Sequence, residues 1–186
     1  MYPSIDTKDG LSTLYEILKI DNTYNHHQQE IIVSLTEWVL TNNYMTFDNQ
    51  IYKQLNGTSM GTSLSVTYAC LYIGYKEKQA IDCFKFRKLD DPLLYKRLID
   101  DCAGVFYNYS QAQFFMQMME QITNDKIKFE YKISNTELIF LDMKLYKDDQ
   151  FKTNNKLSTI LYQKEIINIY LSHHFQHIHQ LYIKHG

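Results

Sequence analysis

The sequence of 186 residues has little proline, glycine or cysteine, and each shortage excludes a class of protein. Two Pro and six Gly are too few for a disordered chain. Three cysteines without Cys-x-x-Cys spacing indicate reduced thiols in an intracellular protein rather than a disulfide framework. No apolar run is long enough to cross a membrane, and no signal peptide is recognisable.

Strong net charge is also missing. A formal charge of −2 offers no global electrostatic argument for nucleic-acid binding. A local basic cluster can contact phosphates, although a solvated helix end explains it equally well. The cluster comprises Lys85, Arg87, Lys88, Lys96 and Arg97. The chain does have 45% hydrophobic and 15% aromatic residues, which at this length suits one globular domain with a sizeable core.

The most informative stretch is 93–106, where apolar residues lead into Asp100-Asp101 and small and apolar residues follow. It predicts a β-hairpin with two carboxylates at its tip. Adjacent residues of a strand point to opposite faces, so both carboxylates reach one spot only at a turn or a strand end. A divalent cation relieves their repulsion, and oxygen ligands suit Mg²⁺ or Mn²⁺. The alternative is an ordinary turn, since Asp is a common turn residue.

A second distinctive stretch is the loop 56–65, which contains two glycines and many hydroxyl groups. Glycine lets a backbone approach a ligand closely, and the N-terminus of a following helix offers N–H groups to phosphate or sugar. The loop lacks the Gly-Lys-Ser/Thr of a P-loop. The alternative is a plain linker whose Ser and Thr residues cap the next helix.

Apolar periodicity predicts the remaining elements. Helices are expected near 9–20, 25–41, 64–84 and 110–124, a hairpin over 44–55, and strands over 127–133, 139–145 and 157–162. We expect Ile31, Leu35, Trp38 and Val39 to face inward, and Ser110 to cap its helix. In the strand 139–145 the odd-numbered positions are expected to share one face.

Two further groups of polar residues are assigned no chemistry. Asp148-Asp149 lies in a polar stretch and is expected to be only a turn. The C-terminal histidines lack the Cys or carboxylate partners that usually complete a zinc site. These are His173, His174, His177, His179 and His185.

Several motifs in fixed order resemble those of reverse transcriptases of the Penelope-like retroelement type. The stretch 54–69, read as Gln-Leu-Asn-Gly-Thr-Ser-Met-Gly-Thr and a run of small residues to Tyr-Ala, resembles the second conserved block. Tyr95 to Asp101 is similar to the third block, Tyr-x-Asp-Asp. The segments 140–142, 161–164 and 172–177 look like the family's Phe-Leu-Asp, Leu-Tyr-Arg-Lys-Pro and Ser-x-His-Pro-x-His. Met1 to Ile5 resembles the end of the first block.

The resemblance implies an α+β palm domain over 1–186, in which an antiparallel sheet that carries the Asp-Asp hairpin packs on helices. The region 147–186 would begin the thumb or connector, and the fingers are absent. The implied activity is RNA-directed DNA synthesis by two Mg²⁺ or Mn²⁺ ions. The implied partners are an RNA template, a DNA primer and deoxynucleoside triphosphates, without a membrane, in the nucleus or the cytoplasm.

The resemblance also assigns roles to residues. Asp100 would be the principal metal ligand, assisted by Asp101. Lys128 would protonate the leaving pyrophosphate, although it also fits a solvent-facing strand lysine. Tyr2 falls at the steric gate that excludes a ribose 2′-hydroxyl. The floor beneath the nucleotide would be formed by Met60, Gly61, Thr62 and Ser65. The doublet is expected to face the bend at Gly61 across a cleft.

The chain departs from the family pattern at several positions. The departures include Val66, Leu98, Glu165 and Phe175, and the metal-binding aspartate of the first block is not present. We therefore expect this chain to be inactive in isolation, as part of a retroelement polymerase. One alternative is a palm-fold remnant that binds nucleic acid without catalysis. A metal-dependent phosphatase or nuclease would need further clustered carboxylates. The nearby acidic residues have no compelling spacing; they are Glu77, Asp82, Asp90 and Asp91.

Overall fold

The computed structural model divides the chain into two compact units, each built from two stretches of sequence. Its description covers residues 1–59 and 61–162 and the backbone of 178–183. Unit 1 comprises Met1–Ala80 and Met119–Ile127, and unit 2 comprises Ile81–Met118 and Lys128–Gly186. The division falls within two helices, α3 (Ser63–Phe86) and α4 (Tyr109–Ile122), which therefore contribute to both units.

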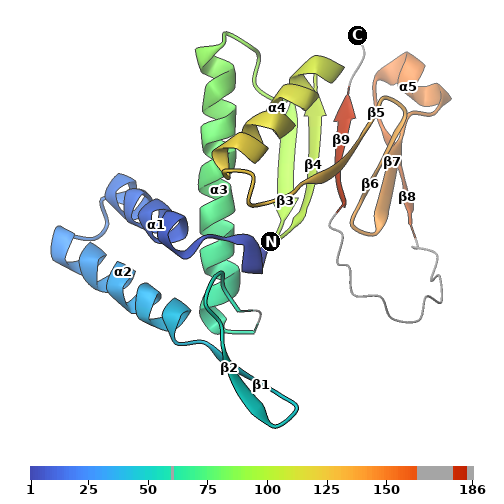
Figure 1. The fold of residues 1–186 in the computed structure, drawn as a ribbon. Coiled ribbons are helices and arrows are strands. Elements are labelled where there is room, and N and C mark those ends of the chain that lie inside the picture. Colours follow the sequence, from blue (N-terminus) through green and yellow to red (C-terminus); the bar gives the residue numbers. More distant parts are fainter. Residues whose placement is uncertain (60, 163–177, 184–186) are drawn as a thin grey trace. The chain divides into compact units, whose positions relative to one another are not determined.

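Unit 1 is mainly helical (Figure 1). Besides its part of α3, its elements are the 3-10 turn Tyr2–Ser4, α1 (Thr7–Asp21), α2 (His26–Thr41), β1 (Tyr44–Phe47) and β2 (Gln50–Lys53). Caps begin both full helices: Asp6 accepts a hydrogen bond from the N–H of Asp9, and Asn25 forms a capping box with Gln28. The core comprises Ile5, Leu14, Leu18, Leu40, Tyr68, Ala69, Tyr72 and Ile73.

Helix α2 lies where the sequence predicts it, but the prediction of its inner face is wrong. Ile31, Leu35 and Trp38 are 44%, 61% and 66% exposed, and the buried positions are Gln29, Thr36 and Leu40. Apolar residues occur on both sides of this helix, so periodicity alone does not select the buried side. The side-chain amide of Gln29 does, because it donates to the carbonyls of Leu18 and Tyr24.

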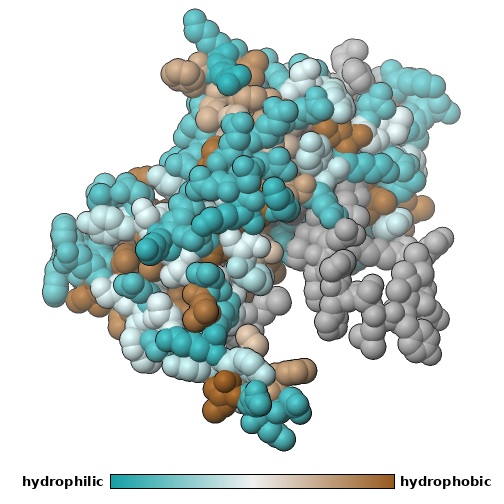
Figure 2. Space-filling view, in the orientation of Figure 1, coloured by the Kyte–Doolittle hydropathy of each residue, from teal (hydrophilic) through white to brown (hydrophobic). Residues whose placement is uncertain are grey.

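The predicted hairpin over 44–55 is confirmed as β1 and β2, joined by a turn at Asp48 and Asn49. Both turn residues have positive φ, 49° and 57°, which is the type I′ geometry that suits the twist of two strands. Every residue of both strands is exposed, including Phe47 and Ile51. Figure 2 shows hydrophobic residues at this hairpin, at the lower end of the view.

Unit 2 contains two sheets, and their elements beyond α3 and α4 follow in chain order. They are β3 (Leu94–Leu98), β4 (Asp101–Phe106), β5 (Glu130–Ser134), β6 (Glu137–Phe140), β7 (Met143–Tyr146), α5 (Asp149–Asn154), β8 (Ser158–Leu161) and β9 (Ile178–Ile183). One sheet has the order β3-β4-β9-β5, and the other is the antiparallel β6-β7-β8. β9 pairs in parallel with both neighbours, so the first sheet is mixed rather than wholly antiparallel as expected.

The predicted strand over 139–145 is wrong, because a turn at Leu141 and Asp142 divides it into β6 and β7. A two-residue turn moves the inward positions from even to odd numbers. Leu138 and Phe140 therefore pack with Leu145, whereas Ile139 pairs with Lys144 on the other face. The predicted odd-numbered face runs across this turn, so it assigns Ile139, which lies before the turn, to the wrong face of the sheet.

The mixed α+β class with small antiparallel sheets is confirmed. The helix predicted over 110–124 is α4, but it begins at Tyr109, and Asn108 rather than Ser110 accepts a hydrogen bond from the N–H of Gln111 at 2.9 Å. None of the described helices is long and apolar enough to span a membrane.

Candidate active site

The Asp100-Asp101 hairpin has the geometry predicted from sequence. β3 and β4 pair antiparallel, with Leu98 opposite Asp101, so the loop between them consists of Ile99 and Asp100 alone. Asp100 lies in the turn and Asp101 is the first residue of β4. Both carboxylates are half-exposed. The doublet thus occupies the tip of a tight hairpin, where neighbouring side chains escape the strict alternation of a strand.

Ile99 has a φ of 55°, in the left-handed region. A β-branched residue there is a conformational outlier that costs on the order of 1–3 kcal/mol. Glycine is the residue that normally takes the first position of a turn with this geometry. The hydrogen-bonded pairing of β3 with β4 therefore holds Ile99 in a strained backbone conformation. Backbone strain of this kind concentrates at binding and catalytic sites.

The base of the hairpin is fixed by aromatic packing within unit 2. Phe106 at the end of β4 is fully buried, and its ring centroid lies 5.4 Å from that of Phe115 and 6.3 Å from that of Phe84. Tyr95 of β3 contacts Phe115, with 5.0 Å between the centroids. Cys102 is also buried, which explains the apolar residues that follow the doublet. A rigid base thus holds the exposed acidic tip.

The opposite face of β4 meets the second sheet of unit 2. Ala103 is buried with Leu138, and Val105 packs against the same cluster. Alternation places Asp101 on this face of the strand, in line with Ala103 and Val105. The side chain of Asp101 has no hydrogen bond or ion pair within the described residues. Its carboxylate is therefore not used to hold the hairpin together.

The glycine-bearing loop and Tyr2 lie against each other in unit 1. The N–H of Thr58 donates to the carbonyl of Tyr2 at 3.0 Å. A Cβ on Gly57 would lie 2.5–2.7 Å from backbone atoms of Pro3, and the φ of Gly57 is 77°. Only glycine fits this close approach of two backbones. Two stretches that the resemblance assigns to one substrate site are therefore in direct contact, although 55 residues separate them in sequence.

Hydroxyl groups hold the far end of the loop. Ser65 is fully buried; its hydroxyl donates to the carbonyl of Ser59 and is hydrogen-bonded to the hydroxyl of Thr62. The N–H of Ser65 also donates to the carbonyl of Thr62 at 3.1 Å. These bonds give Ser65 and Thr62 a role in shaping the loop at the start of α3.

Two buried hydroxyls of the same loop, those of Thr58 and Ser59, have no hydrogen-bond partner among the residues that the structure describes. Buried polar groups are nearly always paired, so these oxygens need a water or a ligand, or another arrangement of the loop. Gly61 has a φ of 113°, and the space beside its Cα is open. The predicted substrate residue Met60 lies outside the described residues. The loop thus combines unsatisfied polarity with open space.

A polar network that sequence reasoning missed ties α1 to α3. The hydroxyl of Tyr72 donates to Asp9 Oδ2 at 2.6 Å, and Lys76 Nζ lies 3.1 Å from Asp9 Oδ1. A Cβ on Gly10 would collide with the hydroxyl of Tyr68, so the two helices approach closely here. Sequence alone carries no signal for this network, because Asp9 resembles any acidic residue in the first turn of a helix.

The network changes the ionisation of its tyrosines. Burial raises the pKa of Tyr72, and the hydrogen bond to Asp9 raises that pKa further. Burial, followed by the nearby charge of Asp9, raises the pKa of Tyr68, whose buried hydroxyl has no hydrogen-bond partner in the described part of the chain. A hydrogen bond from Lys126, at 2.7 Å, lowers the pKa of Asp6. Both phenols therefore remain neutral, and the N-terminus of α1 is held in place.

The remaining predicted residues have varied positions. Lys128 is exposed and precedes β5, so it is not a strand residue. The motif-like segment 140–142 forms a turn, and Leu141 shares with Ile99 a φ of 55°. The histidines 173, 174, 177 and 185 lie outside the described residues, as do Glu165 and Phe175. Only the backbone of His179 is described, in β9.

The chemistry of the doublet suits a hard cation. Mg²⁺ is commonly bound through one or two carboxylates plus substrate phosphates and water. Asp100 and Asp101 supply two such carboxylates on adjacent residues. Within the described part of the chain no group of three His, Cys, Asp or Glu side chains forms a metal site. The donor set therefore fits a cation that is also held by a substrate.

Comparison with known proteins yields no relative: no family model, no curated protein and no solved structure matches the chain.

Proposed function

We propose that the chain takes part in RNA-directed DNA synthesis, with Asp100 and Asp101 as ligands of Mg²⁺ or Mn²⁺. The observation that carries the proposal is the acidic tip of the β3–β4 hairpin, where a strained Ile99 precedes two half-exposed carboxylates. The contact between Tyr2 and the loop beginning at Gly57 supports it, because the resemblance assigns both stretches to the nucleotide site.

In this proposal each part of the chain has one task. The cation, when bound, lowers the pKa of the primer 3′-hydroxyl and neutralises charge on the triphosphate. Asp100 and Asp101 hold it, and the packing of Phe106 and Phe115 keeps their backbone in place. The ring of Tyr2 excludes a 2′-hydroxyl. Gly61 and its neighbours form the floor beneath the base.

A non-catalytic nucleic-acid-binding domain is the second candidate. One observation favours it: no third carboxylate joins the doublet within the described residues. Phosphoryl transfer depends on positioning and charge neutralisation, so an incomplete ligand set lowers activity more than it lowers nucleic-acid binding. The exposed Lys85, Arg87 and Lys88 at the end of α3 would then supply phosphate contacts.

Binding of Mn²⁺, read by paramagnetic broadening of amide resonances, tests the metal site. We expect broadening centred on residues 98–102. Asp100→Asn with Asp101→Asn should weaken Mn²⁺ binding by about tenfold or more. The matched control is Asp90→Asn with Asp91→Asn, a second exposed doublet that precedes β3. The site would be refuted if Mn²⁺ broadened the amide resonances of the Asp100/Asp101 variant as strongly as those of the Asp90/Asp91 variant. Broadening centred on Asp90 and Asp91 in the unaltered chain would refute it as well.

Primer extension on an RNA template separates the two candidate functions. Since two carboxylates are an incomplete set, we expect the chain to bind Mn²⁺ and primer–template without extending the primer. Extension that is lost in Asp100→Asn would establish the enzyme directly. Binding of primer–template that is insensitive to Mn²⁺ and to both aspartates would favour the non-catalytic domain.

A further inference from the structure

A pocket of about 520 Å³ lies between α1 and α3, entirely within unit 1. It is lined by Ile17, Ile20, Asp21, Cys70, Leu71, Gly74, Tyr75 and Lys78. Its volume lies within the range of small-molecule sites, which are mostly apolar with a few placed polar groups. No residue of the candidate active site belongs to it.

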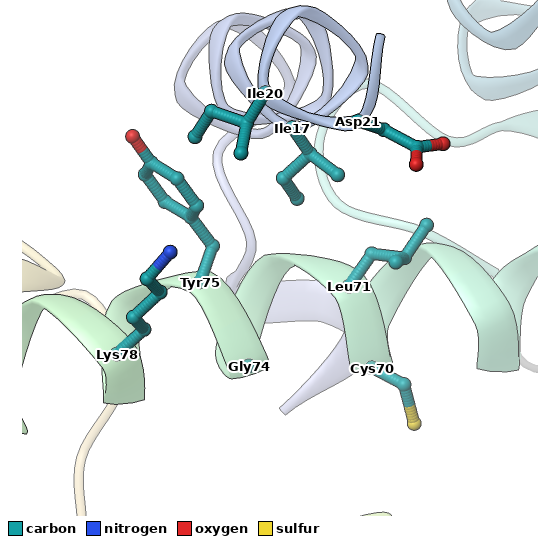
Figure 3. Close-up of a pocket in the computed structure, with 8 residues that line it drawn as sticks. All are labelled: Ile17, Ile20, Asp21, Cys70, Leu71, Gly74, Tyr75 and Lys78. Carbon is teal, nitrogen blue, oxygen red and sulfur yellow. The ribbon is translucent and has the colours of Figure 1, made fainter. Parts of the chain in front are cut away.

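The walls of the pocket are apolar and come from both helices. Figure 3 shows Ile17 and Ile20 of α1 pointing down toward α3, with Leu71 and Tyr75 rising from α3 to meet them. Gly74 lies between these two residues on α3 and presents only backbone. The missing side chain keeps the floor of the pocket open. Ile20 and Leu71 are 56% and 40% exposed, which is unfavourable unless something covers them.

The polar groups lie unevenly around the pocket. Lys78 extends its ammonium group beneath the ring of Tyr75 at one end, whereas the carboxylate of Asp21 points away from the cavity at the other (Figure 3). Neither the Lys78 ammonium nor the Tyr75 hydroxyl has an ion-pair or hydrogen-bond partner in the described part of the chain. One end therefore offers a cation and a phenol to a ligand, and the middle offers apolar surface.

We propose that this pocket binds a small amphipathic carboxylate, with its aliphatic or aromatic body between Ile17, Ile20 and Leu71 and its carboxylate on Lys78. Lys78 is exposed at one end of the pocket, and its ammonium favours an anion, because a carboxylate forms a charge-assisted hydrogen bond there that an uncharged ligand of the same shape does not form. The volume selects a small molecule rather than a protein segment. The site is independent of the proposed nucleotidyl transfer.

The test is titration with decanoate, below its micelle concentration, followed by methyl resonances of Ile17, Ile20 and Leu71. We expect saturable shifts confined to these residues and their neighbours. Decanol, which has the same chain without the charge, should bind about tenfold more weakly. Non-saturable shifts, or shifts spread over the β1–β2 hairpin as well, would show unspecific hydrophobic contact and overturn the proposal.

Variants separate the charge from the cavity. Lys78→Gln should weaken decanoate binding about tenfold, and Lys85→Gln, on the same helix outside the pocket, should not change it. Gly74→Leu should abolish binding by filling the floor, with circular dichroism to verify the helix. If Gly74→Leu does not fold, the comparison of decanoate with decanol on Lys78→Gln decides. Equal affinity for both ligands in the unaltered chain would overturn the assignment of the anion.

Discussion

Two of the Asp-Asp doublets in unit 2, Asp100-Asp101 and Asp148-Asp149, have different surroundings. Asp148 caps α5: its Oδ1 accepts hydrogen bonds from the N–H groups of Gln150 and Phe151, at 2.9 and 3.2 Å. Its Oδ2 accepts a hydrogen bond from the Ser158 hydroxyl at 2.6 Å. At the β3–β4 tip, Asp101 has no such partner among the described residues. One doublet therefore holds the fold together, and at least one carboxylate of the other does not.

The difference shows that the dipeptide itself carries little information. The residues after Asp149 form a helix, whose free N–H groups need an acceptor. The residues after Asp101 form a strand, whose N–H groups bond to β3 instead. A carboxylate that the backbone does not use remains available to a ligand. The expectation that Asp148-Asp149 is only a turn is wrong, because Asp148 caps α5 and Asp149 is its first residue.

The largest effect is expected at a third kind of carboxylate, that of Asp9, which pairs with the buried Lys76. Asp9→Ala leaves Lys76, which is 7% exposed, without its partner, and should lower the free energy of unfolding by about 3 kcal/mol. Urea unfolding measures the change. Lys126→Ala removes the exposed pair with Asp6 and should cost less than about 1 kcal/mol. If both variants lost the same free energy of unfolding, the pair between Asp9 and Lys76 would contribute no more to stability than the exposed pair between Lys126 and Asp6.

The next effect compares the doublets directly. Asp148→Ala removes three hydrogen bonds and should lower the midpoint of urea unfolding clearly. Asp101→Ala should change the free energy of unfolding by no more than about 0.5 kcal/mol. Circular dichroism follows both variants under the same conditions. A larger loss at Asp101 than at Asp148 would reverse the roles assigned to the two doublets.

A smaller effect is expected from the strained turn. Ile99→Gly suits the φ of 55°; the side chain is 36% exposed, so its lost burial offsets part of the relieved strain, and the free energy of unfolding should rise by less than about 1 kcal/mol. Leu141→Gly, at the same φ in the β6–β7 turn, is the matched variant. Under the proposed function, only Ile99→Gly should also weaken Mn²⁺ binding. A loss of stability in Ile99→Gly would show that its side chain contributes more than its strain costs.

The smallest effect concerns pH. The hydrogen bond from Ser158 lowers the pKa of Asp148 in the folded chain. A lowered pKa means that the unfolded chain binds the proton more tightly, so this contribution is present above about pH 4 and is lost as the pH falls through the folded pKa. Ser158→Ala should therefore reduce the acid dependence of stability. The measurement is the midpoint of urea unfolding at neutral and at acidic pH. If the difference between the two midpoints were the same in Ser158→Ala as in the unaltered chain, the assigned role of Ser158 in lowering the pKa of Asp148 would be contradicted.

Sequence reasoning was most successful for local features. The hairpin over 44–55, the hairpin around Asp100-Asp101 and the helix over 25–41 all follow from short-range signals, and each was located correctly. It was wrong where a choice between faces was needed. Trp38 lies on the exposed face of α2, because the hydrogen bonds from Gln29 to the carbonyls of Leu18 and Tyr24 turn the opposite face of the helix inward.

The candidate site divides in the same way. The sequence indicated the acidic tip and the loop around Gly57, and a resemblance connected them to Tyr2. The contact of Gly57 with Pro3, the burial of the Thr58 and Ser59 hydroxyls, and the pocket beside Gly74 depend on residues far apart in the chain. No periodicity or motif encodes such contacts.

By itself the sequence determined most of the helices and hairpins of this protein and the position of two carboxylates at a hairpin tip, because turns, caps and apolar periods are local. Only the tertiary structure decided which helix faces are buried, which aspartates serve as caps and which space remains open. Those outcomes depend on hydrogen bonds and packing between segments that meet only in the folded chain.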